Sequence, residues 1–243
     1  MMYAVFKREF FSLLNSLMAY VAMGVFLLVA GLLLWCFPDT SILSYGYAEL
    51  TGFFNLAPLL FLFLVPALTM RAFAEERREG TYILLASRPL TDWQIITGKY
   101  LACVLLMALS LLPTLIYVYT LLELGLPEGN LDTGATLGAY LGLLLLGSIF
   151  TAIGVFASSL TRNQVIAFAL AVLLCFFFWN GFGALSQLFA GSATESALSW
   201  LSVSTHYQSM GRGVLDTRDL VYFITLNLCF LGLTRLVIGG RQW

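Results

Sequence analysis

Residues 137–160 read LGAYLGLLLLGSIFTAIGVFASSL, a run of 24 residues without a charged side chain. A helix needs about 20 mostly apolar residues to cross the hydrocarbon core of a bilayer, whereas apolar runs of about 10–14 residues are typical of buried helices in soluble proteins. The run therefore predicts a transmembrane helix, and it sets the fold class that the rest of the chain has to fit.

Five further runs of the same kind occur at 17–37, 53–70, 100–122, 164–189 and 220–238. Hydrophobic residues make up 60% of the 243 residues and charged residues only 10%, against about 25% charged residues in ordinary soluble domains. We therefore predict an all-α integral membrane protein with six transmembrane helices in a single domain, 1–243. The first run is predicted to be an uncleaved helix, because it is too long for a signal peptide and no small-residue cleavage site follows it.

The basic residues predict the orientation of these helices. With six spans both termini lie on one side, and that side holds ten of the 12 Lys and Arg residues: Lys7, Arg8, Arg71, Arg77, Arg78, Arg88, Lys99, Arg162, Arg235 and Arg241. Short loops rich in Lys and Arg stay in the cytoplasm, so we predict that both termini are cytoplasmic. The formal net charge of −1 argues against a nucleic-acid partner.

The longest cytoplasmic segment is predicted at 71–99. It contains the charge run Glu75-Glu76-Arg77-Arg78-Glu79, then Gly80-Thr81, and later Pro89, which should end the helix before it. Thr91-Asp92-Trp93-Gln94 matches the capping-box pattern, so we predict two short helices broken at Pro89, the second running into the third span. Two interpretations are open: a solvated loop, or a rigid charged ridge that docks a soluble motor.

Two segments outside the spans are also predicted to be structured. In residues 1–16, apolar side chains recur every three or four positions, which predicts a short amphipathic helix in the headgroup plane; a frayed tail is the alternative. Between the fifth and sixth spans, 181–217 is predicted as an external segment, partly helical, that is re-entrant or lies at the outer surface. Trp200 and Tyr207 are candidate aromatic residues for the interface.

The fourth span is rich in small residues. Gly138 and Gly142 form a GxxxG motif, and Gly154 and Ser158 repeat the spacing, which allows close backbone approach between helices in lipid. We predict helix packing at these positions, either within the chain or between subunits. Thr161-Arg162-Asn163-Gln164 repeats the capping-box pattern and predicts a tight turn before the fifth span.

Catalytic, cofactor and metal motifs are not found in the sequence. Gly98-Lys99 is followed by Tyr100, whereas a phosphate-binding loop needs a Ser or Thr there and further glycines before it. The single histidine, His206, is predicted to be a surface or interfacial residue. Free cysteine behaves as a small hydrophobe, and no C-x-x-C pair suggests a metal site among the four cysteines: Cys36, Cys103, Cys175 and Cys229. We predict that the chain is not an enzyme and that any ATP-driven work comes from another chain.

A secondary carrier is disfavoured, because such carriers need ionisable residues within the membrane and the predicted spans have practically none. The whole pattern instead resembles the ABC-2 type transporter permeases. The resemblance rests on an amphipathic segment before six spans, and on Glu75-Glu76-Arg77-Arg78-Glu79-Gly80-Thr81, Arg88-Pro89-Leu90 and Gly98-Lys99 between the second and third spans. The resemblance covers nearly the whole chain.

More narrowly, the chain is similar to the permease subunits of the gliding-motility ABC transporter of Bacteroidota, the GldF type. The similar stretches include Phe63-Leu64-Val65-Pro66-Ala67-Leu68-Thr69-Met70-Arg71, Leu112-Pro113-Thr114-Leu115-Ile116-Tyr117, Ile153-Gly154-Val155-Phe156-Ala157-Ser158-Ser159-Leu160-Thr161 and His206-Tyr207-Gln208-Ser209.

The resemblance implies an inner-membrane permease with an elbow helix at 1–16 and a cytoplasmic coupling helix within 71–99. In this interpretation Glu75–Thr81 contacts a separate ABC ATPase dimer, which binds ATP and Mg²⁺. The second permease half is a GldG-like membrane subunit with a large external domain, or a second copy of this chain, and lipids surround both. The alternatives are a non-transporting scaffold that transmits force outward, and an ABC exporter unrelated to gliding.

Overall fold

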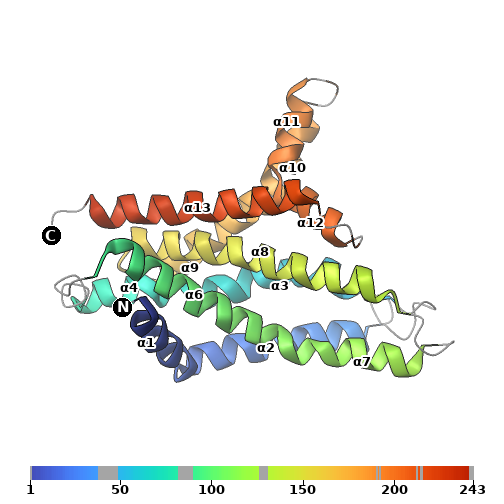
Figure 1. Cartoon of the computed structure of the whole chain (residues 1–243), viewed down its shortest axis with the longest axis horizontal. Coiled ribbons are helices and arrows are strands. Elements are labelled where there is room, and N and C mark those ends of the chain that lie inside the picture. Colours follow the sequence, from blue (N-terminus) through green and yellow to red (C-terminus); the bar gives the residue numbers. More distant parts are fainter. Residues whose placement is uncertain are drawn as a thin grey trace.

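The computed structural model describes residues 2–37, 49–81, 90–125, 131–189, 191, 193–211, 213 and 216–240. In this part of the chain six helical segments are long and apolar enough to cross a membrane, and apart from the end of the fifth they run along the long axis of the molecule (Figure 1). The segments are Leu17–Trp35, Thr51–Glu79, Asp92–Leu124, Thr133–Leu160, Gln164–Leu188 and Thr217–Gly239. The predicted six-helix membrane fold is confirmed.

Several of these segments are built from more than one helix. The first, fourth and sixth are α2 (Leu17–Trp35), α8 (Thr133–Leu160) and α13 (Thr217–Gly239). The second joins α3 (Thr51–Thr69) to α4 (Arg71–Glu79), and the third joins α6 (Asp92–Leu111), the 3-10 helix η1 (Leu112–Thr114) and α7 (Leu115–Leu124). The fifth joins α9 (Gln164–Phe176), the π-helix η2 (Phe177–Gly181) and α10 (Phe182–Leu188). Outside the spans lie α1 (Met2–Leu14), α11 (Ala193–Leu201) and α12 (Val203–Gly211).

The two ends of the bundle differ in charge. α1 and the C-terminal end of α13 lie at the same end (Figure 1). We call it the basic end, because the segments that reach it, namely α1, α4, the first turns of α6, the α8–α9 turn and the last turns of α13, carry eight basic residues: Lys7, Arg8, Arg71, Arg77, Arg78, Lys99, Arg162 and Arg235. Arg88 and Arg241, predicted for the same side, lie outside the described residues, and Arg218 lies at the opposite end.

α8 forms the centre of the bundle. It packs against α3, α9, α12 and α13. In its most apolar stretch 72% of the residues are buried, against 22% for α2 and 17% for the fifth segment. Large apolar side chains of those two outer segments, such as Leu28 and Leu173, are exposed. Lipid solvates such apolar faces as well as protein does, so helix packing in a membrane depends on close fit and polar contacts.

Polar side chains join helices inside the bundle at two places. Pro113 lies in the 3-10 turn η1, where a proline removes a helical hydrogen bond, and the next residue, Thr114, is bonded to α8. Tyr140 donates to the Thr114 carbonyl at 3.1 Å. Deeper in the bundle, Asn227 of α13 accepts from Tyr100 of α6 and donates to Ser148 of α8, each at 2.9 Å. Polar groups at membrane depth need such partners.

The predicted helix caps have different outcomes. The Thr91–Gln94 capping box is confirmed: Gln94 N donates to Thr91 Oγ1 and Thr91 N donates to Gln94 Oε1. The box predicted at Thr161 is wrong, because Asn163 is the N-cap of α9 and its Oδ1 accepts from Val165 N at 2.9 Å. Asparagine ranks above threonine as an N-cap, and the helix begins two residues later than predicted.

The first short helix of the 71–99 segment also ends earlier than predicted. α4 stops at Glu79, since Gly80 adopts the left-handed conformation with φ +72°, which is common for glycine after a helix. Pro89, where the break was predicted, lies outside the described residues.

The predicted external segment 181–217 is largely helical. α10 and α11 form a hairpin that stands away from the bundle, while α12 lies against it (Figure 1). Leu188 and Phe189 of the hairpin are exposed. The prediction of a surface His206 is wrong, because the side chain is buried between α11, α12 and α13 with 4% of its surface exposed.

Candidate coupling site at the basic end

α1 crosses closely over the start of the third span. Val5 is buried and lies over Gly98 of α6, where an added Cβ would come within 3.0 Å of Val5 Cγ1 and 3.2 Å of the Phe6 backbone N. Glycine at this position therefore allows the close contact. The segment predicted as an amphipathic helix forms α1, and its inner face packs on α6.

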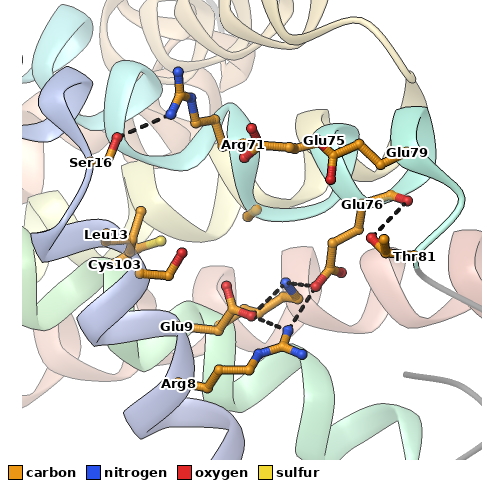
Figure 2. Close-up of a pocket in the computed structure, with 13 residues that line it drawn as sticks. Arg8, Glu9, Leu13, Ser16, Arg71, Glu75, Glu76, Glu79, Thr81 and Cys103 are labelled. Atoms are coloured by element: carbon orange, nitrogen blue, oxygen red, sulfur yellow. Dashed lines mark hydrogen bonds and ion pairs between the residues drawn. The ribbon is translucent and has the colours of Figure 1, made fainter. Parts of the chain in front are cut away.

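Four charged side chains from α1, α4 and α6 meet beside this contact, and we call them the ionic cluster: Arg8, Glu9, Glu76 and Lys99 (Figure 2). Lys99 Nζ lies 3.1 Å from Glu9 Oε1 and 3.0 Å from Glu76 Oε1. Arg8 Nη2 lies 2.8 Å from Glu76 Oε1 and 2.5 Å from Glu9 Oε1. The cluster alternates sign, two cations with two carboxylates, and it ties three helices together.

Lys99 is the most buried charge of the cluster, with 1% of its side chain exposed. Burying an ammonium group is costly unless it is paired. Here two carboxylates neutralise it, and its Nζ also lies 5.2 Å from the centroid of the Phe73 ring, a distance at which a cation is attracted to an aromatic face. The position of Lys99 is therefore fixed by α1 and α4 together.

The carboxyl group of Glu9 depends on this pairing. Burial would raise its pKa, but the charge of Lys99 and the hydrogen bond and charge of Arg8 outweigh burial, so the pKa of Glu9 lies below its ordinary value. Glu9 therefore stays ionised down to more acidic pH in the folded chain than in the unfolded chain.

A cavity of about 490 Å³ opens next to the cluster, between α1 and α4 (Figure 2). Its lining includes Ser16, Arg71, Glu75 and Glu79, and Arg71 Nη1 donates to Ser16 Oγ at 3.0 Å. The cavity is strongly polar at the junction of three helices, so it gives a partner protein access to charged side chains.

On its opposite face α4 is hydrogen-bonded to the C-terminal end of α8. Arg77 is buried, and its guanidinium donates to the backbone carbonyl of Ser159, in the last turn of α8. The last carbonyl groups of a helix have no partner within it and carry partial negative charge, so a cation there is stabilising. Arg77 thus caps α8 from α4.

Ser158 makes the reciprocal contact from α8. Its hydroxyl donates to the Met70 carbonyl at 2.9 Å and accepts from the backbone N–H groups of Phe73 at 3.0 Å and Ala74 at 3.1 Å. The Ala74 N–H would bond to the Met70 carbonyl in a regular α-helix, so the hydroxyl is inserted into the helical ladder. Such insertions are a known cause of helix bends, and this one separates α3 from α4.

The charge run predicted to contact the ATPase is divided between two faces of α4. Glu76 and Arg77 point into the bundle and are engaged by α1, α6 and α8, and Glu75 is half-buried. Arg78 and Glu79, together with Gly80 and Thr81, are exposed. The end of the predicted coupling run is therefore exposed to solvent, whereas Glu76 and Arg77 face the bundle.

The small residues of α8 face other parts of the same chain. An added Cβ at Gly138 would lie 3.1 Å from Gly213 Cα, and one at Gly142 would lie 3.1 Å from Met210 Cβ. At Gly154 an added Cβ would overlap Thr69. The alternatives of packing within the chain or between subunits are resolved for these positions: they pack within the chain.

Sequence reasoning missed the ionic cluster. Arg8 entered only the charge count, Lys99 was also compared with a phosphate-binding loop and cited for the family resemblance, and Glu9 was not singled out as a site residue. One available signal was Lys99 itself, because it lies within a helix whose next turns are apolar, and a lysine there needs a counter-ion.

Among the described residues no group of three or more His, Cys, Asp and Glu side chains could hold a metal ion. The four cysteines are free thiols. A comparison with protein-family models matches residues 4–238 to the family described as "ABC-2 family transporter protein". No curated protein matches the chain.

Proposed function

The chain belongs to the ABC-2 family of transporter proteins, and from this premise we propose how it works as the membrane permease subunit of an ABC transporter. In our proposal the basic end faces the cytoplasm, in the inner membrane, and docks a separate ABC ATPase dimer that binds ATP and Mg²⁺. The exposed face of α4 makes the main contact, and α1 is the elbow helix beside it.

The observation that carries the proposal is the two-sided engagement of α4. Its exposed residues Arg78 and Glu79 are available to a partner, while Glu76 and Arg77 on its inner side are bonded to α1, α6 and α8. A push on the exposed face therefore moves side chains that hold three other helices. A helix attached only through flexible loops would not pass on such a displacement.

α8 provides a route from α4 to the opposite end. It has 28 residues and is about 42 Å long at 1.5 Å per residue. At the basic end it is clasped to α4 through Ser158, and at the other end Gly142 packs against Met210 of α12. We infer that ATP-driven movement of α4 reaches the external element α10–α12 through α8.

The chain itself is not proposed to bind nucleotide. Gly98 and Lys99 lie in the α-helix α6, where Gly98 packs under α1 and Lys99 is held in the ionic cluster. A phosphate-binding loop needs free backbone N–H groups in a glycine-rich turn before the helix, so these two residues are engaged in another role. Nucleotide binding is assigned to the partner ATPase.

We further propose the gliding-motility type for this permease, supported by the similar stretches described above. The second permease half is then a GldG-like membrane subunit with a large external domain, with a second copy of this chain as the alternative. The exposed apolar faces of α2 and α9 are available to either. Native mass spectrometry of the complex in mild detergent should show two permease halves and two ATPase chains; a single permease copy with ATPase and no second membrane chain would contradict this assembly.

The docking assignment is tested by reversing charge on the exposed face of α4. A variant with Arg78→Glu and Glu79→Lys should reduce permease-dependent stimulation of the ATPase by at least about tenfold, because misplaced charges at an interface cost several kcal/mol. Glu123→Lys is the matched control, since Glu123 is exposed at the end of α7. Full stimulation with the double variant would show that the ATPase docks elsewhere.

A transport assay separates an exporter from a scaffold that only transmits force. In proteoliposomes containing the whole complex, an exporter accumulates substrate in an ATP-dependent manner. A scaffold hydrolyses ATP and changes the conformation of its external partner without net transport. The continuous contact from α4 through α8 to α12 is compatible with both outcomes, so this experiment decides between them.

A further inference from the structure

A buried pair of ionisable side chains lies at the end opposite the ionic cluster. His206 of α12 and Asp219 in the first turn of α13 have 4% and 6% of their surfaces exposed. The His206 Nδ1 atom lies 2.7 Å from Asp219 Oδ1, and the Nε2 atom lies 2.8 Å from the backbone carbonyl of Trp200, at the end of α11. One imidazole ring thus joins three helices.

The two contacts of the ring require an extra proton. A backbone carbonyl oxygen can only accept, so the contact with Trp200 needs a proton on Nε2. A carboxylate also only accepts, so the contact with Asp219 needs a proton on Nδ1. Neutral histidine carries one of these protons and imidazolium carries both. Without the second proton, one of the two contacts brings two lone pairs together.

The surroundings of the ring favour the cation. The Tyr222 ring is stacked on the imidazole, with 3.9 Å between centroids and 22° between planes, which is a geometry that attracts a cation to an aromatic face. The other carboxylate oxygen, Asp219 Oδ2, is buried and has no hydrogen-bond partner among the described residues. The charge of Asp219 is therefore balanced within this structure through His206.

Other charged groups near the pair are engaged elsewhere. Asp216 caps α13 by accepting from the Arg218 backbone N–H at 2.9 Å, and the Arg218 side chain is exposed. Glu195 of α11 accepts from the Gly191 backbone N–H at 2.7 Å. The neighbouring helices α8, η2 and α10 contain no Asp, Glu, Lys, Arg or His. Among the residues that the structure describes, Asp219 and Tyr222 are thus the titratable groups that contact the ring.

We propose that His206 and Asp219 form a proton-binding site that latches α11 onto the pair α12–α13 while the proton is bound. Loss of the proton leaves Nδ1–H on Asp219, where the attraction is strongest, and breaks the contact between Nε2 and the Trp200 carbonyl. The end of α11 is then held to α13 by the remaining bond from Tyr222 to the Leu201 carbonyl, at 2.6 Å. Helix α11 therefore becomes freer to move relative to α12.

In our proposal protons reach the site from the outer surface of the bundle. A cavity of about 430 Å³ lies between the end of α11 and the outer turns of α13, and its lining includes Trp200, Tyr222 and Arg218. Two of these residues, Trp200 and Tyr222, contact the imidazole ring directly. The pair is therefore buried one side-chain layer below an open surface. In our proposed orientation, the pH outside the cell sets its occupancy.

The site can be observed directly because His206 is the only histidine of the 243 residues. The full chain, labelled with ¹⁵N-histidine and placed in lipid nanodiscs, is titrated by NMR from about pH 5 to about pH 9, which brackets the ordinary histidine range. We expect both ring nitrogens to carry protons at the acidic end and one to lose its proton as the pH rises. A single neutral tautomer over the whole range would overturn the proposal.

Asp219→Asn is the decisive variant. The Asn amide can donate to a neutral Nδ1 while Nε2–H still bonds to Trp200, so both contacts persist without the extra proton. Opening is measured as thiol labelling at Ser202→Cys, a fully buried position between α11 and α12, in a chain without the four native cysteines. Thr205→Cys, at an exposed position, corrects for the effect of pH on thiol reactivity.

In the chain that keeps Asp219, the corrected labelling at position 202 should rise about tenfold from the acidic to the basic end of the pH range. This is the factor expected for loss of a hydrogen bond to a charged group. With Asp219→Asn it should stay low and constant. Equal labelling at all pH values without the substitution, or an unchanged pH dependence with Asp219→Asn, would refute the latch. The NMR titration keeps the test decisive if the variant fails to fold.

Discussion

The Ser158 hydroxyl donates to the Met70 carbonyl at 2.9 Å, at the point where the second span passes from α3 into α4. A side chain of the central helix α8 thus stands in the place of a backbone donor of another helix. Because α4 carries the proposed ATPase contacts, this bond joins the docking element to the core of the bundle.

The first prediction concerns this inserted hydroxyl. In Ser158→Ala the backbone groups of Met70 and Ala74 can bond to each other, so we expect a loss of no more than about 1.5 kcal/mol in the free energy of unfolding. ATPase stimulation should fall more than stability does, since α4 loses its tie to α8. Thermal unfolding and ATPase assays on the same preparation test this, and unchanged stimulation would contradict a role of Ser158 in coupling.

The second prediction concerns the buried ammonium group of the ionic cluster. Lys99→Met leaves Glu9 and Glu76 with Arg8 as the one remaining cation of the cluster, and removal of one partner from a buried ion pair typically costs about 3–5 kcal/mol. Adding Glu76→Gln should recover a large part of the loss. Measurement of unfolding for both single variants and the double variant gives the coupling energy. Additive effects would mean that the two side chains do not interact.

The third prediction is a pH dependence. Since the pKa of Glu9 lies below its ordinary value in the folded chain, its contribution is present above the ordinary carboxyl range and is lost as the pH falls through the lowered pKa. We expect the stability of the chain to decline on acidification below about pH 4.5, the ordinary value. Glu9→Gln should flatten that part of the profile, and a profile that keeps its slope would exclude Glu9 as the cause.

The fourth prediction uses two glycines in different environments. In Gly154→Ala the new Cβ would overlap Thr69, and overpacking of a close contact costs about 1–3 kcal/mol. Gly24→Ala in α2 is the matched control, because an added Cβ there has no atom within 4 Å. Unfolding in detergent should separate the two variants clearly. Equal stability of the two variants would mean that α8 and α3 lie further apart than in this structure.

The fifth prediction concerns orientation. Single cysteines at Arg78 and Thr205, both exposed and at opposite ends, should react with a membrane-impermeant thiol reagent from opposite sides: position 78 from the cytoplasm and position 205 from outside. His206 is unsuitable for this test because it is buried. Labelling of both positions from one side of intact cells would contradict the six-span topology.

Much of the fold could be predicted from the sequence because the bilayer imposes a length and an apolar composition on each span. The capping box at Thr91 was also predictable, since the two partners are three residues apart and need no tertiary contact. At Thr161 and Asn163 two possible caps compete, and the prediction failed. Local rules allow a helix start at either residue, and the structure has the N-cap at Asn163.

The sequence by itself thus determined a six-helix membrane protein, its charge asymmetry and the segment that resembles a coupling element. Tertiary structure alone decided that Glu76 faces Lys99, that Arg77 caps α8, and that His206 is paired with Asp219. The physical reason is that hydropathy is a property of each segment, whereas the burial of a charge depends on a counter-ion supplied by another helix. Glu76 has that partner 23 residues away, and Arg77 contacts the backbone 82 residues away, distances over which local sequence patterns carry no information.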